Sequence, residues 1–543
     1  MAAKIPEADV CLILEGTYPF VTGGVSSWVH HLISGMPDVT FSLLYISGSK
    51  SLTQEPRYEL PPNVITFLQV YCHDPVVHAD RTKLGGKKEF WKHLDNFHKV
   101  AMDGKLKPFM EMLKRYVIPG ERAVNTEDLL ISHTSWDYLV DTYQETNEGG
   151  SFIDFFWTWR AIHMPFFQIL SAEIPPAKVY HLVSTGYAGI AGIVAKLRTG
   201  RPLLLTEHGI YVKERKLEIN RADWIYSEPE KVITVKTTPG KLKEMWVDNF
   251  LTMGKLTYEF CDEVYTLYGG NLELQVEFGC DRDKLEIIPN GVKMNVFGPL
   301  RDVPRPNDGI RRVGFVGRVV PIKDVKCFIK GCKICQDLCP EMKIEFLILG
   351  PTDEDKQYFK ECDDLVNMLG MQETIKFYGR VNVLEYYPKL DIFALTSVSE
   401  GQPLTILEAA AAGVPTVATN VGSCDELLYG YTEEDKALGK AGIVTNIGQP
   451  RETGEALAKL LKDEDLRQSM IEVGFKRVER YFRQDMVIKR YQDIYMRWAA
   501  TVDAGRYQTH IGPKSTSPNF AGDTQPGNTQ PGNTQPGDTQ AKE

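Results

Sequence analysis

Three features that would place this chain in other protein classes are missing from its sequence. No stretch approaches the roughly 18 uninterrupted apolar residues that a membrane-crossing helix needs. The first residues, MAAKIPEADVCLILEG, lack the basic region, apolar core and cleavage site of a secretory signal. The ten cysteines are too sparse and too irregularly spaced for a disulfide framework. We therefore expect a cytoplasmic protein that is not itself integral to a membrane.

An excess of basic residues is also missing. The formal net charge is −10, whereas proteins that bind nucleic acid normally carry a basic surface. The same charge gives no general attraction to anionic lipid. Nucleic acid is therefore not an expected partner, and any phosphate would have to be bound at a local site.

What the sequence does contain is typical of a large globular protein. Its 543 residues exceed what one hydrophobic core usually organises. Hydrophobic residues make up 43% and charged residues 25% of the chain, which are ordinary values for a folded, soluble protein. Two α/β domains with extensions are the natural expectation.

The first domain is predicted over residues 1–300. The run DVCLILEG is followed by the loop TYPFVTGG and the amphipathic segment VSSWVHHLISGM, which form a strand, a loop and a helix. Further apolar runs alternate with helical segments, as in a parallel sheet covered on both faces; they are VITFLQVY, KVYHLVS, RPLLLTEHG and DEVYTLY. A helical and aromatic stretch at about 75–170 is additional to this repeat and is predicted to be a helical insertion.

The second domain is predicted over residues 301–478. Its strands are expected at RRVGFVG, KIEFLILG, TIKFYG, DIFALT, VPTVAT and AGIVTN. Pro304, Pro306 and Gly309 lie in the connection and mark the expected hinge. A helical segment at 479–504 follows. The tail at 505–543 contains a repeat rich in Pro, Gly and polar residues and is expected to be disordered.

The strongest chemical signal is the segment EGQPLTILE, in which Glu400 and Glu408 flank a predicted helix start. Pro403 suits the first helical turn, and the free amides of Leu404 and Thr405 would then attract an anion. Both carboxylates would lie above the strand ends, where open α/β sheets bind ligands. For an arbitrary pair of glutamates, two solvated side chains would be the more common outcome.

Two cations follow the strand RRVGFVG at the start of the same domain. Arg318 comes directly after the strand and Lys323 lies five residues further on. Preorganised cations in a water-poor cleft stabilise the negative charge of a departing nucleoside diphosphate. Taken alone, this pair is equally compatible with ordinary surface charge.

The first domain offers weaker candidates. Gly23 and Gly24 join the first strand to its helix and would let the backbone approach a phosphate or a sugar, although a plain tight turn explains them equally well. His208 ends the run LLLTEHG, where a lone histidine is usually a structural hydrogen-bonding residue. The segment IPNGV at 288–292 is expected to be a mainly architectural turn with some contribution to the cleft.

Together these motifs resemble the retaining family 4 glycosyltransferases, and the resemblance covers about residues 9–500. It implies two Rossmann-like domains that face each other across a cleft, the GT-B fold, with acceptor binding in the first domain and donor binding in the second. By this resemblance Glu400 contacts the donor sugar and Glu408 the ribose, while the element of Arg318 and Lys323 binds the diphosphate. It also implies that the glycine loop faces the donor and that His208 lies beside the reacting sugar.

The resemblance further implies a UDP-sugar donor, with base contacts near Gly379 and Arg380, and a glycan acceptor. No cofactor and no metal are expected, because the cations and helix ends can neutralise the diphosphate and no Asp-x-Asp lies at a matching strand end. No nucleophile is predicted, so Glu400 is a positioning residue. An epimerase or phosphorylase on the same architecture and a nucleotide-sugar-binding regulatory subunit are the alternatives.

The first domain is also similar to the glycosyltransferases of Pel exopolysaccharide synthesis, in the segments LEGTYPFVTGGVSSWVHHLI and TEHGIYVKER and in the helical insertion. This similarity implies a soluble enzyme of biofilm polysaccharide synthesis. Its expected partners are inner-membrane synthase and export components, which would hold it peripherally at the inner membrane.

Two further patterns favour core packing. Cys327, Cys332, Cys335 and Cys339 include a Cys-x2-Cys pair that invites a zinc interpretation, but they share one broad face of a predicted helix. The aromatic run at 152–170 is more typical of core than of a partner surface.

Overall fold

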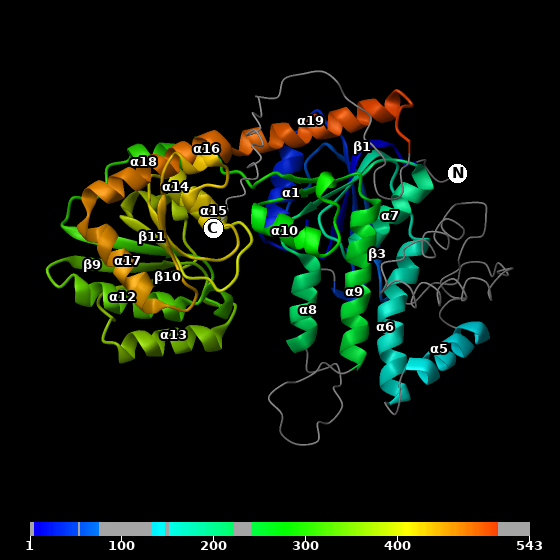
Figure 1. Ribbon diagram of the computed structural model, residues 1–543, viewed down its shortest axis with the longest axis horizontal. Helices are drawn as coiled ribbons and strands as arrows, with labels where there is room; N and C mark the ends of the chain where they lie inside the picture. Colours follow the sequence, from blue (N-terminus) through cyan, green and yellow to red (C-terminus); the bar gives the residue numbers. More distant parts are fainter. Residues whose placement is uncertain (1–4, 53–54, 75–131, 147–150, 222–240, 509–543) are drawn as a thin grey trace, which may run out of the picture.

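The computed structural model describes residues 5–52, 55–74, 132–146, 151–221 and 241–508. They form two α/β domains, the first at the right of Figure 1 and the second at the left. The predicted tail beyond residue 508 and the parts of the predicted insertion at 75–131 and 147–150 lie outside the described residues.

The first domain is built on a seven-stranded sheet with the order β3-β2-β1-β4-β5-β6-β7. Every pairing in it is parallel. The strands are β1 (Ala8–Glu15), β2 (Phe41–Ser47), β3 (Val64–Tyr71), β4 (Ala177–Leu182), β5 (Leu203–Glu207), β6 (Glu263–Thr266) and β7 (Leu285–Ile287). Its helices are α1 (Gly24–Ser34), α5 (His133–Thr146), α6 (Phe152–Ser171), α7 (Tyr187–Thr199), α8 (Tyr211–Arg221), α9 (Lys241–Phe260) and α10 (Gly269–Glu277).

The second domain has a six-stranded parallel sheet with the order β10-β9-β8-β11-β12-β13. The strands are β8 (Ile310–Val316), β9 (Lys343–Leu349), β10 (Ile375–Gly379), β11 (Ile392–Leu395), β12 (Thr416–Thr419) and β13 (Gly442–Thr445). The helices are α11 (Met294–Phe297), α12 (Val325–Leu338), α13 (Lys356–Met368), α14 (Leu404–Ala411), α15 (Cys424–Tyr429), α16 (Glu433–Lys436), α17 (Pro450–Lys462) and α18 (Glu464–Tyr481). The predicted pair of parallel-sheet α/β domains is therefore confirmed.

The chain crosses between the domains at two places that lie side by side. The amide of Val292 donates to the carbonyl of Phe482 at 2.8 Å, and the amide of Gln484 donates to the carbonyl of Val292 at 3.0 Å. A Cβ on Gly291 would lie 2.5 Å from the Cα of Gln484, so only glycine fits between the two segments.

This crossing corrects the predicted hinge at Pro304, Pro306 and Gly309. The segment before Pro304 already packs on the second domain, where Met294, Phe297 and Leu300 join its apolar core. Pro and Gly in a connection indicate a turn but do not say which domain it covers. The earlier IPNGV segment holds the crossing instead.

A last helix, α19 (Gln484–Asp503), follows the second crossing and returns to the first domain, running along the top of Figure 1. Tyr491 and Tyr495 on this helix are fully buried in the core that covers one face of the first sheet. The Tyr495 hydroxyl lies 2.6 Å from Nδ1 of His181, whose Nε2 lies 2.8 Å from the Thr206 hydroxyl. The Tyr491 hydroxyl lies 2.9 Å from the same hydroxyl of Thr206. A buried polar network thus anchors α19.

The pH dependence of stability should report this network. Burial lowers the pKa of His181 to about 3, whereas an unfolded histidine has a pKa of about 6.5. Because the unfolded chain binds the proton first, stability is fully present above pH 6.5 and is lost as pH falls toward 3. We expect the free energy of unfolding of the first domain to fall by up to about 1.4 kcal/mol per pH unit for this histidine below pH 6.5. Urea unfolding between pH 7 and pH 5 measures the slope, which should flatten in His181→Gln and stay steep if other groups dominate.

Both patterns assigned to the core are core. Cys327, Cys332, Cys335 and Cys339 are buried on and just beyond α12, and the described residues contain no cluster of three or more metal-ligating side chains. Helix α6 buries most of its aromatic side chains, although Ile153 and Trp157 are exposed. No helix in the part of the chain that the structure describes is long and apolar enough to span a bilayer.

Candidate active site

A cleft of about 610 Å³ lies between the two domains, a size typical of small-molecule sites. The carboxyl ends of β5 and β6 contribute one wall, together with α8 and α10. The loops after β8 and β11 and the start of α14 form the other. The predicted site residues that line it are Gly24, His208, Arg318, Lys323, Glu400, Leu404 and Thr405.

The loop after β11 is held against both domains. Its carbonyl at Gly401 accepts from the Ser423 amide at 2.9 Å, and Gly422 packs so closely that a Cβ there would lie 2.2 Å from the same oxygen. On the other side, a Cβ on Gly401 would lie 3.1 Å from the carbonyl oxygen of His208. Backbone packing therefore fixes where Glu400 enters the cleft.

Helix α14 begins at Leu404, with Pro403 as the N-cap residue. The sequence analysis placed Pro403 in the first helical turn. In the structure Pro403 precedes that turn, so the helix begins one residue later than predicted. Leu404 and Thr405 are the first two helical residues, so their amides belong to the unpaired set at the helix start. Both residues line the cleft, and this end of the helix carries the positive end of its dipole.

Lys323 and Glu400 form an ion pair across two loops. The Lys323 ammonium donates to Oε1 of Glu400 at 2.5 Å, and the side chains are only 21% and 12% exposed. The Ser397 hydroxyl also donates to Oε1 of Glu400. Arg318 is more exposed and donates to Glu354 at 2.9 Å. Each cation is thus paired with a carboxylate. The Lys323 pair lies inside the cleft, and the Arg318 pair lies at its edge.

His208 lines the cleft, and its buried ring is neutral. Burial lowers its pKa to about 4, so it is uncharged at neutral pH. Neither ring nitrogen has a hydrogen-bond partner in the described structure, although both are buried. A neutral imidazole offers one donor and one acceptor, so this ring can bind a hydroxyl group of a ligand.

Three predicted residues do not line this cleft. Gly23 caps α1 just outside it, and Arg380 is exposed after β10. Glu408 lies further along α14, where it accepts from the Tyr387 hydroxyl at 3.0 Å. Burial raises the pKa of the Glu408 carboxyl, and the tyrosine partly opposes this effect.

Sequence reasoning missed several lining residues. Lys213, Tyr268 and Asn271 come from α8 and from the start of α10. Asn290 lines the cleft as well, which agrees with the contribution expected of the IPNGV segment, and its amide donates to Oε1 of Gln402 in the loop of Glu400. For the residues on α8 and α10, the available signal was their position just after the ends of β5 and β6, where ligands of parallel sheets bind.

A second contact joins the domains at the start of α10. The carboxylate of Glu426 on α15 accepts from the amides of Gly269 at 2.9 Å and Gly270 at 3.1 Å. Tyr431 packs on Gly269, and a Cβ on this glycine would lie 2.4 Å from the Tyr431 ring. A carboxylate from the second domain therefore caps a helix of the first.

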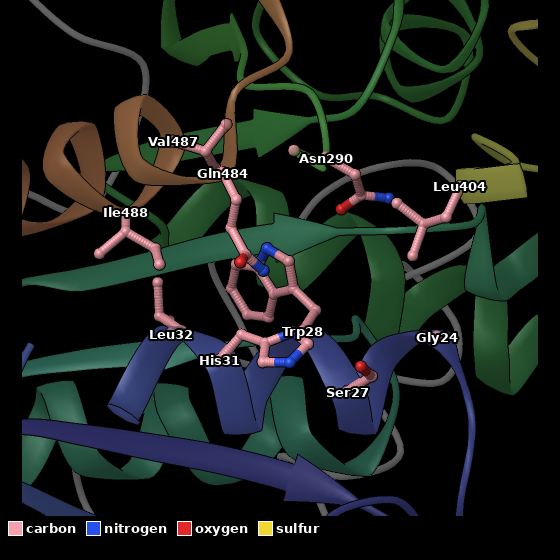
Figure 2. Close-up of a pocket in the computed structure, with 11 residues that line it drawn as sticks. Gly24, Ser27, Trp28, His31, Leu32, Asn290, Leu404, Gln484, Val487 and Ile488 are labelled. Atoms are coloured by element: carbon pink, nitrogen blue, oxygen red, sulfur yellow. The ribbon is translucent and has the colours of Figure 1, made fainter. Parts of the chain in front are cut away.

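Beside the crossing lies a small groove, shown in Figure 2, with about 30 Å³ of free volume. The indole of Trp28 lies among residues of α1, of the start of α19 and of the Asn290 turn. His31 accepts there from the Lys293 ammonium at 2.8 Å, and burial and Lys293 lower its pKa to about 4.

Comparison with known families assigns both halves of the chain. Residues 8–283 match the family described as "Domain of unknown function (DUF3492)". This match covers about half of the chain. The chain belongs to the DUF3492 family. Beyond the DUF3492 domain, residues 310–463 match "Glycosyl transferases group 1", so the second domain is a group 1 glycosyltransferase domain.

Named relatives are similar to part of this DUF3492 protein. A D-inositol 3-phosphate glycosyltransferase of Paenarthrobacter aurescens is 28% identical over 206 residues, which are 36% of this chain and 48% of the relative. A mannosylfructose-phosphate synthase of Agrobacterium fabrum is 27% identical over 257 residues, 44% of this chain and 53% of the relative. The matched stretch thus spans about half the length of each relative.

Solved structures match the DUF3492 protein over both domains. Sucrose-phosphate synthase from Thermosynechococcus elongatus superposes with a TM-score of 0.54 at 14% identity, covering 90% of this chain and 99% of that one. Anabaena Alr3699/HepE in complex with UDP and glucose gives a TM-score of 0.52 at 14% identity, with the same coverage. These similarities establish the two-domain GT-B fold.

Proposed function

We propose that this protein is a retaining glycosyltransferase that transfers a hexose or N-acetylhexosamine from a UDP-sugar to a glycan. The observation that carries the proposal is the interdomain cleft, where the paired Lys323 and Glu400 and the start of α14 lie opposite the neutral His208. The group 1 glycosyltransferase match and the UDP and glucose complex of a structural neighbour support it.

The proposed donor lies with its diphosphate against the second domain. Arg318, Lys323 and the amides of Leu404 and Thr405 supply positive charge where the leaving diphosphate gains negative charge. Glu400 holds the Lys323 ammonium in place. The remaining lone pairs of its carboxylate accept hydrogen bonds from sugar hydroxyls. His208 contributes one further hydrogen bond from the first domain.

The proposed reaction needs neither a covalent enzyme nucleophile nor a metal ion. Attack of the acceptor hydroxyl on the face that the diphosphate leaves would retain the anomeric configuration, with the departing phosphate oxygen accepting the acceptor proton. Resident cations of the protein balance the diphosphate charge. No cofactor is needed beyond the UDP-sugar substrate.

The acceptor is proposed to be a growing exopolysaccharide of the Pel, biofilm-forming type. Support comes from the similarity of the segments LEGTYPFVTGGVSSWVHHLI and TEHGIYVKER, which surround Gly24 and His208 at the cleft. Inner-membrane synthase and export components are the proposed partners, with the enzyme cytoplasmic and peripheral to that membrane. A regulatory subunit that only binds the nucleotide sugar would bind UDP without releasing it from a donor.

UDP binding without divalent metal tests the donor site. Arg318→Ala is expected to weaken UDP binding by about tenfold to a hundredfold, because a hydrogen bond between charged groups contributes about 1.5–3 kcal/mol. Isothermal titration calorimetry in the presence of a chelator measures the affinity. The control is Arg451→Ala, which removes an exposed arginine of α17 that pairs with Glu455. Absence of wild-type binding, or binding only with metal, would overturn the proposal.

A further inference from the structure

Trp28 on α1 packs directly against the ring of His208. The two ring centroids are 4.6 Å apart and the planes meet at 78°, an edge-to-face contact. Contacts of this geometry between aromatic rings contribute about 0.5–1.5 kcal/mol beyond burial of area. Trp28 is therefore close enough to influence how the imidazole is oriented.

The backbone of His208 is fixed, but its ring is not held by hydrogen bonds. Asn271 donates to the His208 carbonyl, and the preceding Glu207 is buried and accepts from Tyr258 and Gln275. The ring nitrogens, by contrast, have no partner within the described structure. Because the χ2 angle of histidine has a broad energy well, packing must select the ring orientation.

Trp28 is itself held on its other side. Its ring meets Tyr491 at 5.3 Å and 80°, and His181 at 6.2 Å and 82°. Both partners belong to the buried network that anchors α19 through Thr206. The Trp28 indole thus lies between the hydrogen-bonded network of Tyr491 and the His208 imidazole.

We propose that Trp28 is a positioning residue that orients His208 toward the donor sugar, with Tyr491 of α19 supporting the indole from behind. The inference rests on the proposed glycosyltransferase function, in which His208 binds a sugar hydroxyl. It adds a residue that touches no ligand but determines how well His208 meets the sugar in the transition state. A loss of orientation of this kind lowers turnover more than ground-state binding.

Kinetics of Trp28→Leu and Trp28→Phe test this role. Trp28→Leu should lower kcat about tenfold, which corresponds to the loss of one oriented aromatic contact, and should leave the Kd for UDP within about twofold of wild type. Trp28→Phe, which keeps an aromatic ring, should recover most of the loss. The control is Trp157→Leu, the same change at an exposed tryptophan of α6.

A double-mutant cycle with His208→Ala separates positioning from general stability. If Trp28 acts through His208, Trp28→Leu should cause no further loss in the His208→Ala background. Additive losses, or full kcat in Trp28→Leu, would overturn the inference. A wild-type protein that binds a UDP-sugar but never turns it over would contradict the proposed function instead.

A second measurement does not depend on turnover. Histidine ring NMR follows the titration of His208, assigned by the signal that disappears in His208→Ala. In the wild type this ring should stay neutral to well below pH 6, because burial lowers its pKa to about 4. In Trp28→Leu the loosened ring should gain contact with water and titrate at higher pH. An unchanged titration would show that Trp28 does not hold the imidazole.

Discussion

Lys323→Ala is expected to reduce turnover of the donor sugar by about a hundredfold to a thousandfold, the range found when one preorganised donor to a developing anion is removed. Two effects combine. The leaving diphosphate loses its most enclosed cation, and Glu400, which is only 12% exposed, loses its ion-pair partner. An unpaired carboxylate in the cleft would also repel the diphosphate.

Steady-state kinetics with UDP release as the readout measures the effect, with kcat falling more than KM rises. The matched control is Lys326→Ala, because Lys326 lies three residues further along and pairs with the exposed Glu361 outside the cleft. That variant should keep wild-type turnover. Equal losses in the two variants would show that the effect comes from general charge and not from the cleft.

Arg477→Met is expected to destabilise the second domain by about 3–5 kcal/mol, the usual cost of removing one partner of a buried ion pair. Arg477 on α18 is 1% exposed, and its Nε donates to Asp435 at 2.6 Å. Its other nitrogens donate to the carbonyls of Leu428, Asp435 and Gly439 at 2.8–3.0 Å. Removing the guanidinium leaves the Asp435 carboxylate buried without its cation.

Chemical denaturation, followed by the transition of the second domain, measures this loss. Arg480→Met on the same helix is the control, since its pair with Glu434 is half exposed and exposed pairs contribute less than about 1 kcal/mol. Adding Asp435→Leu to Arg477→Met removes the stranded charge and should recover part of the stability. If the double variant is no more stable than Arg477→Met, the loss of stability comes from the missing hydrogen bonds to the backbone carbonyls.

Much of the fold could be predicted because parallel strands buried on both faces produce apolar runs. The eleven predicted strands are all present, whereas β2 (FSLLYIS) and β7 were not predicted. β7 has only three residues, too few for a periodic signal. The return of α19 could not be predicted either, because an amphipathic helix does not reveal which domain its apolar face covers.

The residues of the candidate site were also predicted only in part. The strand ends predicted that Arg318, Lys323 and Glu400 lie at one edge of the second sheet, where ligands of parallel sheets bind. The place of His208 was predicted from the family resemblance, and His208 lines the same cleft. Arg380 was assigned by family resemblance, and Glu408 was also predicted from its place after the helix start, but neither residue lines the cleft. Trp28 gave no signal, since a tryptophan on an amphipathic helix is ordinary core. Its contact with His208 depends on packing between elements far apart in sequence.

The path of α19 also bears on how the chain is made. Domains generally fold as units during synthesis, beginning with the N-terminal one. Here the first sheet is covered in part by Tyr491 and Tyr495, which leave the ribosome only after the whole second domain. Part of this apolar face therefore stays uncovered while the second domain is translated. The domain that is translated first is therefore completed last.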